Sequence, residues 1–343
     1  MKPLVSILIP AYNAEKWLAA TVGSVLAQTW HNIEVIIVDD GSRDETFKIA
    51  KAYESKLLKA VSQENQGAAA ARNNAMSLAQ GDYIQWLDAD DLLAPSKIER
   101  QVDLIKAGVS DKTLLTSAQA RFYYQPAKAK FKPNALWQNL EPIDWFLHRF
   151  NGPLNVWMQP ATWLVSRKLS GLAGPWNEQL SLDDDGEYSS RLIMHSVGTR
   201  FCRTSISYYR SGNFDSLSHP NSKKALISYF LSIRLCIGYL LSLRDDEITR
   251  QASVNFIQNR IRYFYPNHKD ILTQAERLAD DLGGQIRPPI ESNKFKLVQK
   301  FVGHERAIAL KNLTWRYQIS AKKCASWLGY KLTPKTPRSS DGQ

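Results

Sequence analysis

Alternation between short apolar runs and helical segments in the first ninety residues constrains the fold more than any other feature of the sequence. Four runs, rich in β-branched, Leu or aromatic residues, have the length of buried strands. They are residues 4–9, 33–38, 57–61 and 83–87. The helical segments between them are residues 15–28, 44–53 and 67–79. This β-α-β-α-β-α-β order predicts an α/β fold whose mostly parallel sheet is covered by helices on both faces.

The pattern changes along the rest of the chain. Aromatic residues and prolines become frequent over 122–176, which indicates loops around a pocket. An acidic helix start follows at 182–195, and 223–282 has a largely helical pattern. We therefore predict a catalytic domain at 1–215, a helical extension at 216–286 and a basic tail at 287–343. The polar end of that tail, from residue 333, is expected to be disordered.

The basic charge of the chain is concentrated in the tail. The formal net charge is +11, but residues 287–338 contain 12 Lys and Arg against 2 Asp and Glu, a net of +10, which leaves about +1 for the rest. Because the body is nearly neutral and carries no known nucleic-acid motif, we expect no nucleic-acid partner. Basic segments with Trp, Phe and Leu are typical of helices on anionic membranes. A solvated basic extension packed on the body is the alternative.

Residues 225–243 could be taken for a membrane span, because Arg234 is the only charged residue in the run. A span needs about 20 apolar residues, and here Arg234 and several serines interrupt the run, so we predict a buried helix. No signal-peptide pattern opens the chain, and the three cysteines have neither zinc nor disulfide spacing. We expect a cytoplasmic protein whose tail allows peripheral association with the inner face of the membrane.

Acidic residues follow two of the predicted strands, where ligands of parallel sheets bind. Neither GxGxxG nor GxxxxGK[ST] is present, so a nucleotide at this sheet would be held by carboxylates and a metal. The DADD sequence at 88–91 offers the oxygen ligands that Mg²⁺ and Mn²⁺ prefer, although a polar turn that caps a helix is the alternative. The acids of VDDGS at 38–42 can accept hydrogen bonds from a base or a ribose, or cap the next helix.

Four motifs carry a family resemblance. PAYN at 10–13, VDDGSRDET at 38–46, ENQGAAAARN at 64–73 and GDYIQWLDADD at 81–91 resemble the family 2 inverting glycosyltransferases in order and spacing. The resemblance implies a GT-A fold, with a Rossmann-like sheet flanked by helices and a C-terminal helical extension. It also implies a divalent metal cofactor, Mn²⁺ or Mg²⁺, held by Asp90. The residues that it implies for the donor nucleotide are Pro10, Ala11, Tyr12, Asn13, Asp40, Gln66, Arg72, Asp88 and Ala89.

The resemblance also implies a catalytic base in the sequence LDDDGEYSSR at 182–191. Asp185 aligns with the base of the family. Asp184 occupies the position where the family has Glu, so Asp184 remains an alternative base. An acidic helix start favoured by the helix dipole is the alternative for the whole cluster. His219 could join the metal, as a His does in some relatives, or be a surface residue.

Aromatic and amide side chains lie between the donor motifs and the base in sequence. Trp faces stack on sugars and amides bond hydroxyls, so Trp157, Gln159 and Trp176 could bind the acceptor. A place in the hydrophobic core is the alternative for each Trp.

Together with these residues, the family resemblance implies a metal-dependent, inverting hexosyltransferase of cell-surface polysaccharide biosynthesis. The donor would be a nucleotide sugar, with UDP favoured over GDP or dTDP, and the acceptor a hydroxyl of a glycan or a lipid-linked saccharide. A catalytically inactive relative that serves as a scaffold, and a basic nucleic-acid-binding protein, are the alternatives.

Overall fold

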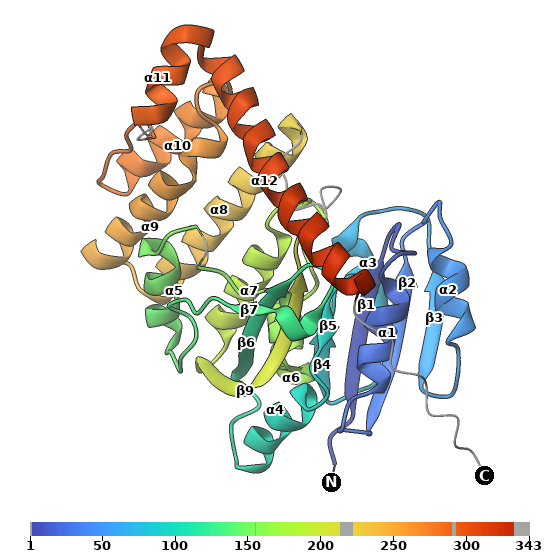
Figure 1. Cartoon of the computed structure of the whole chain (residues 1–343). Helices are drawn as coiled ribbons and strands as arrows, with labels where there is room; N and C mark the ends of the chain where they lie inside the picture. Colours follow the sequence, from blue (N-terminus) through green and yellow to red (C-terminus); the bar gives the residue numbers. More distant parts are fainter. Residues whose placement is uncertain (1, 155, 213–221, 290–292, 333–343) are drawn as a thin grey trace, which may run out of the picture.

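A five-stranded sheet forms the N-terminal part of the molecule (Figure 1). The computed structural model describes residues 2–154, 156–212, 222–289 and 293–332. The strands, in the order β3-β2-β1-β4-β8, are Leu58–Ser62, Ile33–Asp39, Val5–Ala11, Tyr83–Trp86 and Val165–Ser166. The first four are parallel and β8 is antiparallel to β4. The four strands expected from the sequence are therefore confirmed.

Helices cover both faces of this sheet, as the alternation predicted. The helices α1, α2 and α3 are Leu18–Leu26, Thr46–Ala52 and Ala68–Leu78. Ile7 and Ile37 share one hydrophobic cluster with Leu18 of α1, whereas Leu8 and Ile36 share the other cluster with α3. Since neighbouring residues of a strand point to opposite faces, near-continuous apolar strands are the sequence signature of a sheet buried on both sides.

A second sheet, of order β5-β9-β6-β7, was not anticipated from the sequence. Its strands, in chain order, are β5 Leu92–Leu93, β6 Leu114–Phe122, β7 Lys130–Phe131 and β9 Thr199–Arg210. The long strands β6 and β9 are parallel, and a register shift interrupts their pairing after Ser117. Residues 122–176 are also more ordered than the loops that we expected, because they contain the helix α5, Pro142–Asn151. The other helices up to β9 are α4 Lys97–Lys106, η1 Pro126–Lys128, η2 Pro160–Thr162, α6 Arg167–Ala173 and α7 Asp184–His195.

The C-terminal part is helical and forms a second lobe (Figure 1). Its helices are α8 Lys223–Leu243, α9 Glu247–Arg260, η3 Ile261–Tyr263, α10 Lys269–Asp281, α11 Asn293–Val302 and α12 His304–Leu332. Side chains of α8, α9 and α10 belong to the same hydrophobic cluster as α3 and α5. Phe150 of α5, for example, stacks on Phe256 of α9 with ring centroids 3.9 Å apart. The expected disorder from residue 333 and the role of His219 fall outside the described residues.

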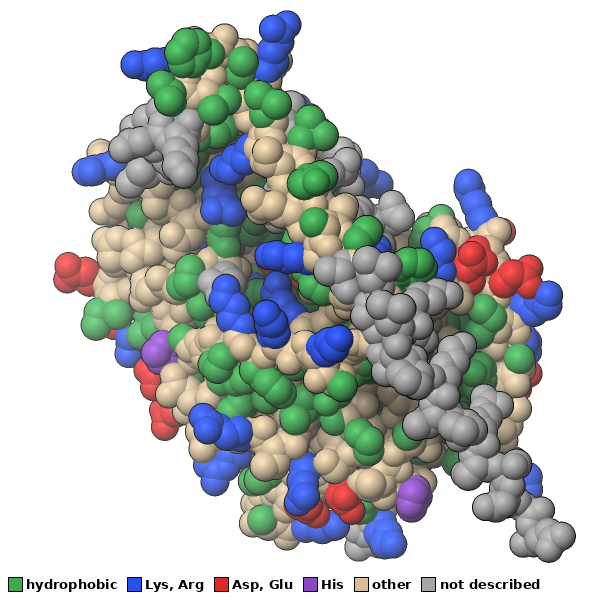
Figure 2. Space-filling model, viewed as in Figure 1, with side chains coloured by type: hydrophobic (Ala, Val, Ile, Leu, Met, Phe, Trp, Pro, Cys, Tyr) green, Lys and Arg blue, Asp and Glu red, His purple; other side chains and the backbone are tan. Residues whose placement is uncertain are grey.

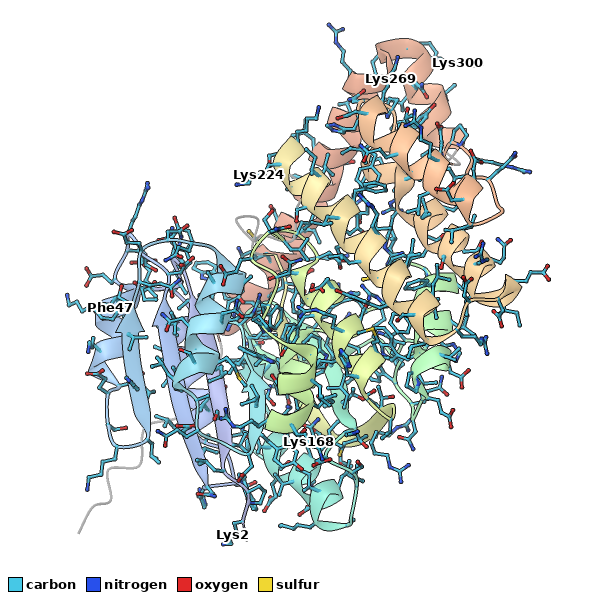
Figure 3. The ribbon with its side chains drawn as sticks, turned by 180° about the vertical axis from the view of Figure 1, so that it is seen from behind. Lys2, Phe47, Lys168, Lys224, Lys269 and Lys300 are labelled. Atoms are coloured by element: carbon cyan, nitrogen blue, oxygen red, sulfur yellow. The ribbon has the colours of Figure 1, made fainter. Side chains whose placement is uncertain are left out.

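Within the described residues, α8 is the one helix long and apolar enough to cross a membrane. Half of its apolar stretch is buried inside the protein. It packs between α7 and α9. In the reverse view of Figure 3, α8 begins near the labelled Lys224 and lies next to the other helices of the C-terminal lobe. These contacts match the buried helix that the sequence favoured.

Candidate active site

The turns after β1 and β2 are joined to each other. The Asp40 backbone N–H donates to the carbonyl of Ala11 (2.8 Å), and the Asn13 N–H donates to Ser42 Oγ (2.9 Å). Asn13 Oδ1 in turn accepts from the Arg43 N–H. Asn13 has a φ of +48°, a conformation that Asn adopts more readily than most residues. Asn13 therefore shapes the turn, while Tyr12 beside it is 48% exposed and free to meet a ligand.

Asp40 is buried and holds the loop that leads into α3. Its Oδ1 accepts from Gln63 Nε2 (2.8 Å) and from the Gln66 N–H (2.9 Å), and its Oδ2 accepts from the Gly67 N–H (2.9 Å). Gly67 has a φ of +96°, which a residue with a Cβ rarely adopts. Asp40 therefore has a structural role besides the contact with the nucleotide that we expected, because its carboxylate positions the backbone at Gln66.

The preceding residue, Asp39, is the other acid of the VDDGS motif, for which the family resemblance implied no separate role. Its Oδ2 accepts from Ser62 Oγ (3.1 Å) and from the Ser42 N–H (3.3 Å). Its Oδ1 is buried and has no hydrogen-bond partner among the described residues. Buried polar atoms are nearly always paired, so this oxygen can accept from a bound ligand or water.

Arg72 connects the donor motifs to the acidic cluster of α7. It lies in the first turns of α3 and is 6% exposed. Its Nη2 donates to Asp88 Oδ1 (3.0 Å) and its Nη1 to Asp184 Oδ2 (2.6 Å). Its guanidinium also lies over the Trp176 ring, with Cζ 4.4 Å from the centroid. One side chain therefore brings together two acids that are far apart in the sequence.

The DADD turn after β4 is held from two sides. Thr21 Oγ1 donates to the carbonyls of Ala89 and Asp91, both at 2.9 Å. Arg210, at the end of β9, donates its backbone N–H to Asp91 Oδ1 (2.8 Å) and its Nε to the carbonyl of Asp90 (2.7 Å). Burial and the charges of Asp90 and Asp88 raise the pKa of Asp91 well above its ordinary value. Arg210 is thus a supporting residue that the sequence motifs did not identify, and Asp91 of the DADD motif is buried as part of that support.

Asp88 and Asp90 remain partly exposed on the same turn. Within the part of the chain that the structure describes, no group of three or more His, Cys, Asp or Glu side chains could hold a metal alone. Mg²⁺ in nucleotide sites is typically bound through one or two carboxylates, with substrate phosphates and waters completing its shell. The partly exposed carboxylates of Asp88 and Asp90 fit a cation of that kind, and Asp90 would be its ligand from the protein.

The two candidate bases at the start of α7 have different partners. Asp184 is paired with Arg72, whereas the one hydrogen bond to Asp185 from the described residues comes from the Gly186 N–H (2.8 Å). Burial, followed by the charges of Asp184 and Asp183, raises the pKa of Asp185 to about 8. A carboxyl group with a pKa near the working pH is well suited to take a proton from a hydroxyl. The geometry therefore favours Asp185 as the base.

Side chains of α8 hold the loop that carries Asp185. Ser228 Oγ accepts from the N–H groups of Ser181 (2.8 Å) and Leu182 (3.2 Å), and Ser232 Oγ donates to Asp183 Oδ2 (2.7 Å). Further along the helix, the Tyr239 hydroxyl donates to Glu187 Oε1 (2.6 Å). These three residues of α8 are spaced by four and seven positions, so they lie on one face of the helix. The serines that interrupt the apolar run thus bind the loop that carries Asp185.

The same loop is tightly packed against α5. Arg149, which is 2% exposed, donates from Nη1 to the carbonyl of Gly186 (2.8 Å), and its Nη2 lies 3.7 Å from Asp183 Oδ2. A Cβ at Gly186 would collide with Asp183 Oδ1 and with Arg149. Asp183 itself has a φ of +61°. This combination shows a loop whose shape is fixed by its surroundings.

Two of the three expected acceptor residues are buried in the structure. Trp176 is 2% exposed and stacks on Tyr188 at 4.1 Å, and Gln159 is 1% exposed and donates to Ser207 Oγ. Neither can offer an open surface to a sugar in this conformation, so for both the core alternative describes the structure. Trp157 is partly exposed and packs edge-on against Tyr209 (5.6 Å), and it remains available.

The parallel sheet, the paired turns after β1 and β2 and the acidic turn after β4 together define the GT-A fold of glycosyltransferases. Residues 6–158 match the family model described as glycosyl transferase family 2. Over 103 residues it is 44% identical to an uncharacterized glycosyltransferase of Rickettsia typhi, a match that covers 30% of this chain and 32% of that protein.

Two further similarities concern a curated enzyme and a solved structure. Over 103 residues the chain is 41% identical to WfgD of Escherichia coli, named a UDP-Glc:α-D-GlcNAc-diphosphoundecaprenol β-1,3-glucosyltransferase, covering 30% of this chain and 41% of that protein. The chain thus matches less than half the length of these curated relatives. The structure of Staphylococcus aureus TarS 1–349 with UDP-GlcNAc is similar with a TM-score of 0.64 at 18% identity, over 81% of this chain and 82% of that one. At this identity the likeness shows the fold.

Proposed function

We propose that this chain is a metal-dependent, inverting glycosyltransferase. It moves a hexose from a UDP-sugar to a hydroxyl of a glycan or lipid-linked saccharide during the synthesis of a cell-surface polysaccharide. The observation that carries this proposal is the double ion pair of Arg72 with Asp88 and Asp184. It joins the turn expected to bind the donor to the loop of Asp185, so that a leaving group and a base fit at one site.

The relatives support the choice of donor and acceptor. The name of WfgD specifies a UDP-glucose donor and a saccharide acceptor linked to diphosphoundecaprenol. Structures of TarS contain UDP-GlcNAc or UDP. In this chain, the exposed ring of Tyr12 and the backbone held by Asp40 at Gln66 are suited to bind the base and ribose.

The proposed reaction is a single displacement. Asp185 takes the proton of the acceptor hydroxyl, whose oxygen then attacks the anomeric carbon while the bond to the diphosphate breaks on the opposite face. Because one carboxylate acts as base and none forms a covalent intermediate, the anomeric configuration is inverted. Arg72 holds Asp184 and Asp88 in place, and its positive charge would favour a negatively charged leaving group at this site. Asp90 would hold a divalent cation, which would neutralise part of the negative charge of the leaving group.

A transfer assay tests this proposal. Purified protein is first screened with nucleotide sugars and Mn²⁺ by thermal shift, since ligands that bind the native state raise its Tm. Donors that stabilise the protein are then tested for transfer to saccharide acceptors, with and without EDTA. We expect transfer from a UDP-sugar that EDTA abolishes and Mn²⁺ restores, and that Asp90→Ala loses.

Three results would contradict the proposal. Donor binding without transfer to any saccharide acceptor would favour the inactive scaffold. Transfer that persists in EDTA would show that the reaction does not depend on a metal. Tight binding of nucleic acid without nucleotide-sugar binding would favour the remaining alternative.

A further inference from the structure

We propose that α11 and α12 form a docking surface for an anionic lipid bilayer, a function beyond the transfer reaction. The surface is an apolar stripe made of Leu297, Phe301, Leu310, Leu313 and Tyr317. It would place the protein on the inner face of a membrane.

The stripe is unusually exposed for large apolar side chains. Phe301 is 81% exposed, Tyr317 77% and Leu313 62%. Leu310, Leu313 and Tyr317 follow one another at spacings of three and four, so they share one face of α12, and Leu297 and Phe301 share one face of α11. Figure 2 shows hydrophobic side chains along this part of the molecule, with Lys and Arg side chains close by. An apolar face on two successive helices needs a partner.

The charge of the segment identifies that partner. Residues 287–338 have a net charge of +10. Lys300, Arg306 and Lys322 are among the exposed basic residues of the two helices. Helices that lie on membranes combine two features. Their apolar side chains enter the membrane interface, and their Lys and Arg side chains contact the anionic headgroups. A second copy of this segment would instead bring two strongly positive surfaces together, and a nucleic acid would leave Phe301 unburied.

The two helices contact each other, and α12 also contacts the rest of the protein. Phe295 of α11 and Ala307 of α12 are buried, and Lys311 Nζ of α12 lies 5.2 Å from the Phe295 ring. Farther along α12, Lys323 Nζ donates to the carbonyl of Gly212 (3.0 Å), two residues after Arg210. Figure 1 shows α12 running from the helical lobe back towards the sheet. Docking through the stripe would therefore hold the DADD turn close to the membrane, where a lipid-linked acceptor of the proposed reaction would be presented.

Vesicle binding by the full chain tests the surface without any donor or acceptor. The protein is sedimented with vesicles of phosphatidylcholine alone or mixed with phosphatidylglycerol, at low and high salt. We expect binding to the anionic vesicles that weakens with salt. The double variant Phe301→Asp/Leu313→Asp should bind them at least about tenfold more weakly, because two charges replace the inserted side chains. Its far-UV circular dichroism and Tm should match the parent protein.

The matched control changes two apolar residues of similar exposure outside α11 and α12. Ile248 is 60% exposed and Val197 is 58% exposed, and Ile248→Asp/Val197→Asp should bind vesicles like the parent. The proposal is overturned if anionic vesicles are not bound, or if both double variants bind equally well. A vesicle-free dimer that Phe301→Asp/Leu313→Asp dissociates would also overturn it, because the stripe would then cover a second copy. Transfer to a water-soluble acceptor, measured separately, tests the proposed function independently.

Discussion

Asp184 and Asp185, at the start of α7, show how the surroundings of a side chain give two chemically identical carboxyl groups different charge states. Asp184 is neutralised by Arg72, whereas Asp185 is half-buried beside other acids and has a raised pKa. The first arrangement suits a structural carboxylate and the second suits a base. The residue-scale predictions test this division.

Asp185→Asn should keep donor affinity and lose most turnover. Asn is close to Asp in volume, so the pocket should survive, but it cannot take the acceptor proton. General-base catalysis contributes about 10²–10⁴-fold, and a loss of that order is expected in kcat as well as in kcat/KM. Steady-state kinetics together with donor binding measured by calorimetry would check this result.

Asp184→Asn is the matched control. An Asn at this position can still accept from Arg72 but no longer balances its charge, so we expect weaker donor binding and a smaller loss of kcat. If Asp184→Asn is inactive while Asp185→Asn retains most of its rate, the base is Asp184. If both remain active, the acidic cluster is only a helix start.

The raised pKa of Asp185 makes two pH predictions. A base acts in its ionised form, so kcat/KM should rise with pH and level off above about 8. For stability the sign is the reverse, because the folded protein favours the neutral carboxyl. The preference of the folded protein for protonated Asp185 adds to the free energy of unfolding. This stabilisation is complete below about pH 4, where Asp185 is protonated in both states, and it is lost as the pH rises towards 8. Asp185→Asn should therefore raise the Tm at pH 8 and leave it unchanged at pH 4; a lower Tm at pH 8 would contradict the assignment.

At the scale of elements, α8 both fills the hydrophobic core and supports a neighbouring loop, although its sequence indicates only a long apolar helix. Its apolar residues pack into the core, and its Ser228, Ser232 and Tyr239 bind the loop between residues 181 and 187. The composition of α8 would allow it to cross a membrane, but in this structure α8 supports the loop that carries the candidate base.

Ser232→Ala should impair turnover more than donor binding. The substitution removes the hydroxyl that Asp183 Oδ2 accepts from, so the loop that carries Asp185 loses one anchor. Small displacements of catalytic groups can cost up to about 100-fold in rate, and we expect a fall in kcat of about 10-fold or more with donor KM little changed. Ser242→Ala, at an exposed position of the same helix, is the control. Equal kinetics of the two variants would show that Ser232 has no positioning role.

At the scale of the whole molecule, the helical lobe and the sheet are not independent. Side chains of α8, α9 and α10 share one hydrophobic cluster with α3 and α5. The boundary that the sequence suggested near residue 215 therefore separates segments of chain that bury each other.

We predict that this shared core unfolds in one cooperative transition. Calorimetry, tryptophan fluorescence and far-UV circular dichroism should give one coincident midpoint. Phe256→Ala in α9 should lower that whole transition, because it removes the stack on Phe150; large-to-small changes of a buried Phe cost about 3–5 kcal/mol. Ile248→Ala, at an exposed position of α9, should leave the midpoint unchanged. Two resolved transitions, with only one affected by Phe256→Ala, would show separate folding units.

The sequence by itself determined the four parallel strands of the first sheet, the helices between them and the residues at their ends, but not the antiparallel strand β8. Strands buried on both faces produce continuous apolar runs, and helices produce a period near 3.6, so both can be recognised within a few residues of chain. Asp40, Asp88 and Asp90 could be identified in the same way, because each directly follows such a run or belongs to a short motif.

Only the tertiary structure decided how distant residues combine. The pairing of Arg72 with Asp184 joins residues 112 positions apart, and the second sheet depends on strands β6 and β9, whose sequences lie far from each other. The burial of Trp176 and Gln159, and the support of the base loop by α8, are also contacts between separate elements. Local periodicity reports that one face of an element is buried but not what buries it, so these partners follow from packing of the whole chain.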